Sequence, residues 1–475
     1  MAGSRKSKSD SPGLLRRFFC RQGSWLRTLL ALTTFQACVF LYAWLVYLIP
    51  TTTRPQDLQN GVHITRAEFQ DAMKVASDAA RPIWERVDAD CELFVLKMDE
   101  PKPTAFGADA SALRFRFGQQ TVTASSATEL SAAVNRTGRP WLCRVVATAC
   151  GTEAHASEKS SASSAADERI PLLSFVDSPA YLLKSGNWLA FLNKVSYASL
   201  TARQFYMFVG TLPADLVASR AEGLPWQPCR EKPGNGIHVP KTIAVLAFLH
   251  KVVPSPKYVM YVDADAWFSA SAFAGRASPE AYLSLSGVAE LVGSSNHFLM
   301  GKIVMNGGQW ILKNSDWGRG FMSLWWRARC GEKDQLPLWS VLFASWSADL
   351  DGAFRYDPEK FAEYEVASTY ARDRLRAMVG HVIAGSEFST YEWSGIAVRS
   401  LDLPRVKLLP SAPFPEDAQD PLPAFRSDIY SADLPFVCHR GTYNDPIITH
   451  TSRMQLDGFL TLVVTNKLRM LGNAP

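Results

Sequence analysis

Two aspartates, Asp263 and Asp265, stand two residues apart directly after the apolar run 258–262. Where a strand opens into a loop, carboxylates at this spacing can direct oxygen ligands at one divalent cation, and Mg²⁺ and Mn²⁺ prefer oxygen ligands. Such a cation can bridge a diphosphate and neutralise the charge that develops on it. The pair therefore predicts a metal site that handles a diphosphate-containing ligand.

The spacing alone is a weak signal, because it occurs twice more, at residues 88–90 and 349–351. Only the pair at 263–265 ends a run that is apolar enough to be an interior strand. Location therefore distinguishes it from the other two. For Asp88 and Asp90 we expect a solvated helix end.

Alternating apolar runs and helical patterns surround the aspartate pair. Strands are predicted at 171–176, 205–209 and 258–262, with helices at 188–200 and 242–253 between them. This order predicts crossover connections on a parallel sheet. In such sheets ligands collect beyond the carboxyl ends of the strands, which is where the aspartates fall.

An uncharged run at residues 28–49 follows a basic N-terminus. At about 1.5 Å per residue it spans roughly 33 Å, enough for a hydrocarbon core of about 30 Å. It ends without a small-residue cleavage site, so a retained signal anchor is favoured over a cleaved signal peptide; a buried core helix is a weaker alternative at this length. Positive-inside bias predicts that residues 1–27 are cytosolic and that the body is luminal or extracellular.

Composition divides the remaining chain. We predict a polar stem at 50–63, a small α+β module of unassigned role at 64–150, a Ser- and Ala-rich linker at 151–167 and the main domain at 168–475. Within the module, a helix is expected at 64–87 and strands at 92–98, 113–117 and 141–147.

Charge and cysteine usage narrow the function classes. The net charge is +5, of which the first 27 residues contribute +6, so the body is nearly neutral and nucleic-acid binding is disfavoured. Six cysteines follow the span, which allows 15 pairings, and sequence alone leaves the choice open. None has the spacing of a zinc site. The sequon at Asn135 predicts a surface position.

The segments 258–267 and 305–319, with Leu324-Trp325-Trp326, resemble the Golgi galactosyl-, mannosyl- and xylosyltransferases of fungi and plants, which are retaining enzymes with the Rossmann-like α/β GT-A fold. The similarity extends, in the family's order, over roughly residues 168–455. Its further matching residues are Asn193, Lys194, Tyr197, Pro240, Lys241, Lys333, Asp334 and Gln335.

The resemblance implies a role for each matching position. Asp263 and Asp265 are expected to bind the metal and the nucleotide diphosphate, and His450 to complete the metal shell, although alone it would be a buried structural histidine. The remaining expected donor-site residues are Asn306, Gly307 and Lys241.

Asp334 and Gln335 match an acidic and amide pair at the donor sugar and acceptor. The alternative for Asp334 is a helix N-cap before Leu336. Arg453 stands near where the family has a lysine beside the diphosphate, and its planar guanidinium would bind phosphate through two hydrogen bonds.

No strongly placed nucleophilic Ser or Cys motif or general-base His is apparent. Retaining transfer can proceed mainly by leaving-group stabilisation and positioning, whereas double displacement needs a carboxylate, for which Asp334 is the only candidate. The tryptophans at 310, 317, 325 and 326 are more typical of a core than of a sugar platform, and we assign them no role.

These observations predict a Golgi type II membrane glycosyltransferase that uses Mn²⁺ or Mg²⁺. It would move galactose, xylose or mannose from a nucleotide sugar to a glycan or glycoprotein acceptor. One alternative is a tethered, non-catalytic glycan-binding or scaffold protein with the same fold. Another is a glycoside hydrolase, whose paired carboxylates lie about 5–10 Å apart across a sugar.

Overall fold

The structure is a computed structural model of the 475-residue chain. It describes residues 63–95, 113–124, 126–147, 169–213, 239–275, 277–284, 287–295, 305–329, 334–349, 401–403, 405–409, 425–427 and 436–439. The predicted cytosolic tail, membrane span and linker, and all of the predicted stem but residue 63, lie outside these ranges. Among the described residues, no helix combines the length and the apolar character needed to cross a bilayer.

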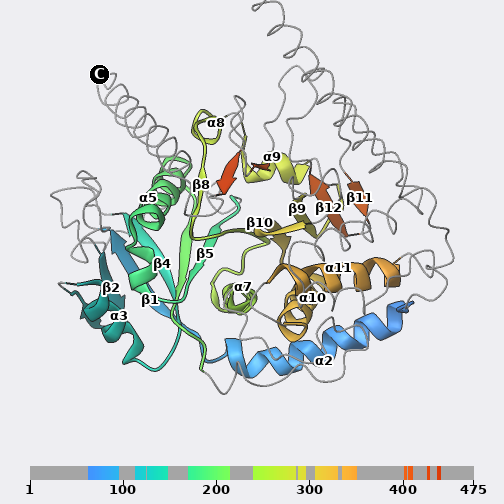
Figure 1. The fold of residues 1–475 in the computed structure, drawn as a ribbon, viewed down its shortest axis with the longest axis horizontal. Helices are drawn as coiled ribbons and strands as arrows, with labels where there is room; N and C mark the ends of the chain where they lie inside the picture. The colour runs from blue at the N-terminus through green and yellow to red at the C-terminus, as the bar shows by residue number, and fades with distance from the viewer. Residues whose placement is uncertain are drawn as a thin grey trace, which may run out of the picture. The chain divides into compact units, whose positions relative to one another are not determined.

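The described residues within Asn60–Pro475 belong to one compact unit. They include one mixed sheet of eleven strands (Figure 1). In spatial order the strands are β11 (Leu401–Leu403), β12 (Val406–Leu409), β9 (Leu291–Ser295), β10 (Met305–Lys313), β7 (Tyr258–Val262), β5 (Leu172–Val176), β6 (Phe205–Val209), β4 (Trp141–Ala147), β1 (Asp88–Val95), β2 (Leu113–Phe117) and β3 (Gln120–Val122).

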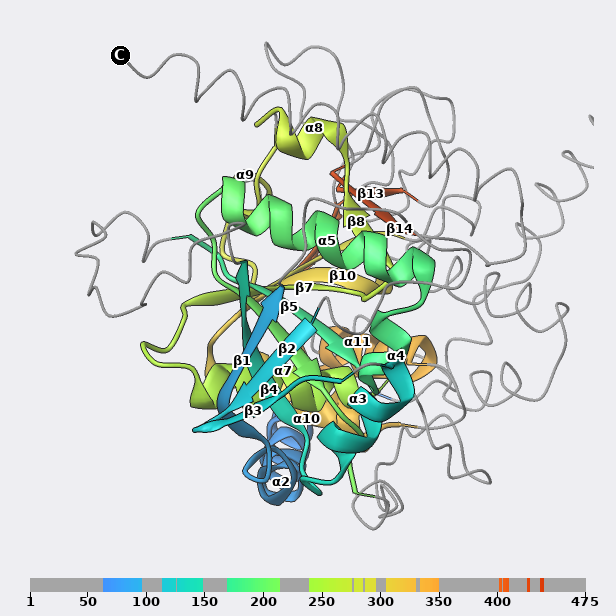
Figure 2. The same cartoon turned by 90° about the vertical axis from the view of Figure 1, so that its left-hand side faces the viewer.

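Helices cover both faces of this sheet. The described helices are α2 (Arg66–Trp84), α3 (Ala127–Asn135), α4 (Pro179–Leu182), α5 (Ser185–Leu200), α7 (Pro240–Lys251), α8 (Ala270–Phe273), α9 (Pro279–Ser284), α10 (Asp316–Arg327) and α11 (Gln335–Asp349). Phe205 of β6 packs on Phe191 of α5 and the next residue, Tyr206, packs on Phe248 of α7. Because successive strand residues point to opposite faces, α5 and α7 cover opposite sides, as Figures 1 and 2 show.

The predicted crossover core is confirmed. Strands β5, β6 and β7 are parallel, with β5 in the middle, and α5 and α7 connect them. Their residues form near-continuous apolar runs because both faces are covered by helices. The sheet as a whole is mixed, because β10 pairs antiparallel with β7 and β4 pairs antiparallel with β6.

The N-terminal strands do not form a module of their own, which corrects the predicted division between 64–150 and the main domain. The segment 88–147 supplies β1 to β4, and β4 pairs with β6 along four residues, so these strands extend the main sheet (Figure 2). Helix α2 likewise packs on α10 and α11 rather than on its neighbours in sequence. Backbone pairing thus joins both sides of the predicted boundary.

The prediction of a solvated helix end at Asp88 and Asp90 is also wrong. Helix α2 starts with a capping box formed by Thr65 and Glu68 and ends at Trp84. After a short turn, both aspartates lie in β1, where Asp88 is half-buried and Asp90 is exposed.

Two features, a buried disulfide and an exposed sequon, bear on the expected compartment. A disulfide joins Cys91 of β1 to Cys143 of β4, so one of the pairings that the sequence left open is now assigned. Asn135, the sequon residue, is exposed at the end of α3, as predicted.

A second, three-stranded sheet begins directly after the aspartate pair. Strand β8 (Ala266–Phe268) pairs antiparallel with β14 (Val437–His439), which pairs parallel with β13 (Arg426–Ser427). Aromatic side chains of Tyr197, Phe268 and Phe436 pack together beneath it. The C-terminal part of the chain therefore returns to the strand that follows Asp265.

Candidate functional site

The aspartate pair forms a turn at the carboxyl end of β7, between β7 and β8. The backbone N–H of Asp263 donates to the carbonyl of Gly308 at 2.8 Å, and the N–H of Ala266 donates to the carbonyl of Asp263 at 3.1 Å. Both aspartates are half-buried. The turn is therefore fixed to β10 while its carboxylates remain partly open to solvent.

A buried lysine holds this turn from the α5 side. The Nζ atom of Lys194 donates to the carbonyl oxygens of Asp263, Ala264 and Ala266 at 3.0, 2.8 and 2.6 Å. The preceding residue, Asn193, donates to the carbonyl of Phe268 at 2.9 Å and accepts from its N–H at 2.7 Å. Adjacent side chains of one helix thus bind the backbone at both ends of the segment.

Lys194 is fully buried, and this burial lowers its pKa to about 7 even though the negative charges of Asp265 and Asp263 favour its charged form. In the sequence, Lys194 is one of the residues that match the family, but no role was predicted for it. The available signal was a polar pair, Asn193-Lys194, inside an otherwise apolar stretch of α5.

A second buried lysine lies on the opposite face of the sheet. Lys241, near the start of α7, forms an ion pair with Asp334 and lies 3.6 Å from Oδ1 of Asp263. Its Nζ also donates to the carbonyl of Gly307 at 2.8 Å. Burial opposes the charge on Lys241, but attraction by both carboxylates outweighs it, so the pKa of Lys241 is raised.

Aromatic side chains enclose Lys241. The Tyr261 hydroxyl donates to Oδ1 of Asp263 at 2.9 Å, and burial together with the nearby carboxylate holds the pKa of Tyr261 well above its ordinary value, so the hydroxyl remains a donor. The rings of Tyr261 and Trp325 lie 5.4 and 5.7 Å from Nζ of Lys241. Trp310 stacks on Tyr261 and is fully buried.

All four tryptophans that the sequence left unassigned are buried. They belong to the core, and Trp310 and Trp325 lie beside the site.

Two glycines of β10 allow the carboxylates to approach the strand. A Cβ atom on Gly307 would lie 2.7 Å from Oδ2 of Asp334, and one on Gly308 would lie 2.5 Å from Oδ2 of Asp263. Real Cβ atoms do not approach so closely, so the arrangement requires glycine at both positions. The Asn306 side chain is buried and accepts from the N–H of Gly308 at 2.7 Å, which stabilises the backbone conformation there.

Asp334 combines two features that the sequence offered as alternatives. It directly precedes α11, as an N-cap would, and its carbonyl accepts from Leu338 N–H and from the Trp325 indole. Its carboxylate, however, pairs with Lys241, and its side chain is only 11% exposed. Gln335 is the first residue of α11.

The structure thus brings together most of the predicted site residues: Asp263, Asp265, Asn306, Gly307, Lys241 and Asp334. His450 and Arg453 lie outside the described residues. Within the described ranges, no three His, Cys, Asp or Glu side chains converge as a complete metal-binding group. Asp349 is elsewhere, at the end of α11, 3.8 Å from Arg405.

Comparison with known proteins gives limited matches. No protein-family model matches the chain, and no curated protein matches it. Among solved structures, one similar chain is a glycosyltransferase involved in the glycosylation of the major capsid of PBCV-1, with 11% identity and a TM-score of 0.23, covering 33% of this chain and 65% of that one. Another is the galactosyltransferase LgtC in complex with donor and acceptor sugar analogues, with 15% identity and a TM-score of 0.23, covering 44% and 83%.

Proposed function

We propose that this chain is a metal-dependent, retaining glycosyltransferase of the GT-A type that transfers galactose, xylose or mannose from a nucleotide sugar to a glycan or glycoprotein. The observation that carries the proposal is the Asp263–Asp265 turn, which is held from opposite faces of the sheet by Lys194 and Lys241. Such reinforcement of a carboxylate-bearing turn is typical of a site that must bind charge at a fixed position.

The side chains available as metal ligands suit a hard divalent cation. Asp263 and Asp265 offer carboxylate oxygens, which Mg²⁺ and Mn²⁺ prefer, and both are partly accessible. When bound, such a cation supplies charge stabilisation to a departing diphosphate. We propose that His450 and the donor's own phosphates complete the ligand set, which two carboxylates alone do not fill.

The protein's own groups then act mainly by positioning. Lys194 fixes the backbone of the turn, and Lys241 fixes the carboxylate of Asp334 against Gly307, beside the expected sugar position. Tyr261 stays protonated and orients Asp263 by its hydrogen bond. Preorganisation of this kind lowers the barrier without a strong base.

Three further parts of the proposal rest on the sequence. Gln335 is assigned to the sugar and acceptor, and Arg453 to the diphosphate, where its guanidinium would stabilise the leaving group. Residues 28–49 are proposed to anchor the protein in the Golgi membrane with the catalytic domain in the lumen.

A glycoside hydrolase is disfavoured by the geometry. Hydrolytic carboxylates are separated by about 5–10 Å, with the sugar between them. Here the ammonium group of Lys241 lies between Asp263 and Asp334 and contacts both, so the space that a sugar would need is filled by a side chain.

The test is donor hydrolysis by the full chain with Mn²⁺ and, separately, UDP-galactose, UDP-xylose, UDP-glucose and GDP-mannose. We expect one donor to be cleaved, and Asp265→Asn to lose nearly all of that activity while its thermal unfolding is unchanged. Cleavage that persists in excess chelator would contradict the metal assignment. Metal-dependent donor binding without cleavage or transfer to any glycan would instead support the non-catalytic scaffold.

A further inference from the structure

A second cluster of charged side chains lies on the sheet away from the aspartate turn. In the strand order β2, β1, β4 and β6, Arg116 pairs with Glu92, Glu92 with Arg144 and Arg144 with Tyr206. Directly paired residues of neighbouring strands project to the same face of a sheet. The four side chains therefore form one row across four strands, which we call the Arg116–Tyr206 row.

A cavity of about 510 Å³ lies over this row. Its charged and aromatic lining consists of Asp90, Glu92, Arg116, Arg144, Tyr206 and Lys251. This volume falls in the range of about 300–1,000 Å³ that is usual for small-molecule sites.

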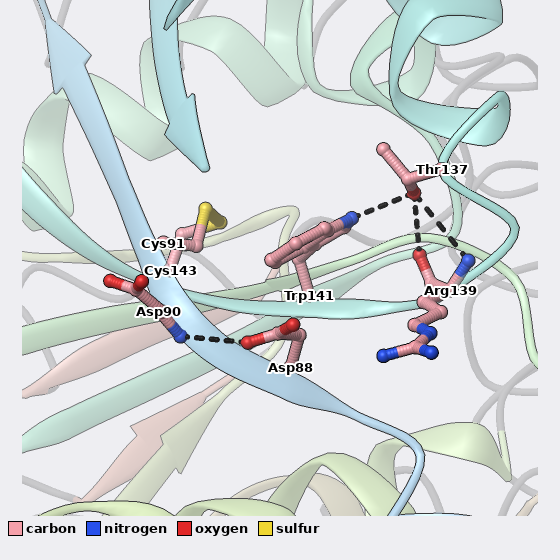
Figure 3. The surroundings of a disulfide bond; sticks show 7 residues. All are labelled: Asp88, Asp90, Cys91, Thr137, Arg139, Trp141 and Cys143. Atoms are coloured by element: carbon pink, nitrogen blue, oxygen red, sulfur yellow. Dashed lines mark hydrogen bonds between the residues drawn. A yellow bond between two sulfur atoms is a disulfide. The ribbon is translucent and has the colours of Figure 1, made fainter. Parts of the chain in front are cut away.

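The floor of the cavity is fixed from behind. Cys91 and Cys143 form the disulfide between β1 and β4 (Figure 3). They adjoin Glu92 and Arg144 in sequence and are buried in the core on the opposite face. Because successive strand residues alternate, this bond holds the two strands together beneath the row without occupying the cavity. The backbone spacing of the row is therefore set before any ligand binds.

Two of the lining cations, Arg116 and Lys251, are also held in place. Arg116 forms an ion pair with Glu92 and lies over the ring of Phe94, 5.2 Å from its centroid. Lys251, at the end of α7, donates to the carbonyls of Glu85, at 2.7 Å, and Val87.

The balance of charges indicates the ligand. Three cations, Arg116, Arg144 and Lys251, face two carboxylates, Asp90 and Glu92. Within the described part of the chain Arg144 has no ion-pair partner, whereas the other cation of the row, Arg116, is paired with Glu92. Guanidinium groups bind oxyanions through paired hydrogen bonds, whereas carboxylates accept hydrogen bonds from hydroxyls.

We propose that this cavity binds a saccharide that carries an acidic group, with the acidic group at Arg144 and the hydroxyls at Asp90 and Glu92. The site is distinct from the aspartate turn and does not depend on the proposed transfer reaction. Lys241 and Lys251 lie ten residues apart near opposite ends of α7, which separates the two sites by roughly 15 Å along the helix.

Titration of the full chain, by calorimetry or ligand-observed NMR, tests the proposal. The probes are glucose 6-phosphate, glucuronate, neutral glucose and inorganic phosphate. We expect at least one acidic sugar to bind more tightly than glucose and than phosphate alone. Arg144→Ala should weaken that binding about tenfold or more, because a charge-assisted hydrogen bond is lost, and Arg144→Lys should weaken it less.

Two controls separate this site from general charge effects and from the aspartate turn. Arg136→Ala removes another exposed arginine, at the end of α3, whose Leu130 and Val134 pack in the core with Cys91 and Cys143, and it should leave binding unchanged. Asp265→Asn should also leave it unchanged. Thermal unfolding of each variant verifies its folding.

Several results would overturn the proposal. One is equal affinity for glucose and the acidic sugars, and another is phosphate alone binding as tightly as glucose 6-phosphate. The proposal also fails if Arg136→Ala weakens binding as much as Arg144→Ala does, or if Asp265→Asn loses binding. Dissociation constants weaker than roughly 10 mM for both acidic sugars would do the same.

Discussion

Lys194→Met is the substitution that most directly tests how the aspartate turn is held. Methionine keeps a long apolar side chain in α5 but removes the ammonium group that binds three carbonyl oxygens. A buried acceptor without its donor costs roughly 1–3 kcal/mol. The carbonyl of Asp263 keeps the bond from Ala266 N–H, and the cost of burying a charged lysine disappears. We therefore expect a net loss of about 2–4 kcal/mol in the stability of the turn.

Two measurements on the full chain check this expectation. The unfolding temperature of Lys194→Met should fall by roughly 5 °C. Its Mn²⁺ affinity, measured by calorimetric titration, should fall at least about tenfold, because the carboxylates are no longer held at one position. Lys184→Met is the matched control, since Lys184 precedes the same helix but is exposed, and it should change neither quantity.

Two results would refute the inference that Lys194 positions the aspartate turn. If Lys194→Met unfolds at a lower temperature but binds Mn²⁺ and cleaves donor within about twofold of the wild type, the lysine stabilises the fold without positioning the site. If Lys184→Met loses as much affinity, the effect reflects overall charge.

Three further predictions follow from single contacts. Gly307→Ala should lower donor turnover at least about tenfold, because the new Cβ would lie 2.7 Å from the Asp334 carboxylate that it must displace. Burial disfavours the charged form of Glu280, but hydrogen bonds and charge from Arg203 lower its pKa to about 2 from 4.5. Its stabilisation is therefore complete above about pH 4.5 and is lost as the pH falls toward 2, so the difference in unfolding temperature between wild type and Glu280→Gln should shrink across that interval. Cys143→Ser should reduce the free energy of unfolding by roughly 4 kcal/mol, the chain-entropy value for a loop of 52 residues, as measured by denaturant titration.

The central strands could be predicted from the sequence because buried parallel strands appear as short continuous apolar runs. Strands β5, β6 and β7 agree with the predicted runs to within one residue. The aspartate turn followed from its place after the last of these runs. Such patterns are local, and each needs only the few residues of its own strand.

Other features depend on contacts between distant segments, which local patterns do not contain. The pairing of β4 with β6 joins residues about 65 positions apart, so a Ser- and Ala-rich segment between them looked like a domain boundary. Lys194 was not predicted to be buried because lysine is almost always exposed unless it is paired. Its partners are backbone carbonyls supplied 69 to 72 residues later, which no side-chain motif marks.

Charge balance gives a second reason to expect the proposed metal dependence, besides the preference of the cation for carboxylate oxygens. Three carboxylates, Asp263, Asp265 and Asp334, face two lysines, Lys194 and Lys241, so the cluster carries at least one net negative charge, and more whenever Lys194 is neutral. A diphosphate would be repelled by this cluster, whereas one divalent cation would reverse the sign of its charge when Lys194 is charged and neutralise the cluster when Lys194 is neutral. Chelation should therefore weaken binding of the intact donor, measured by equilibrium titration, and not only slow its cleavage. Unchanged donor affinity in excess chelator would mean that the diphosphate binds away from these carboxylates.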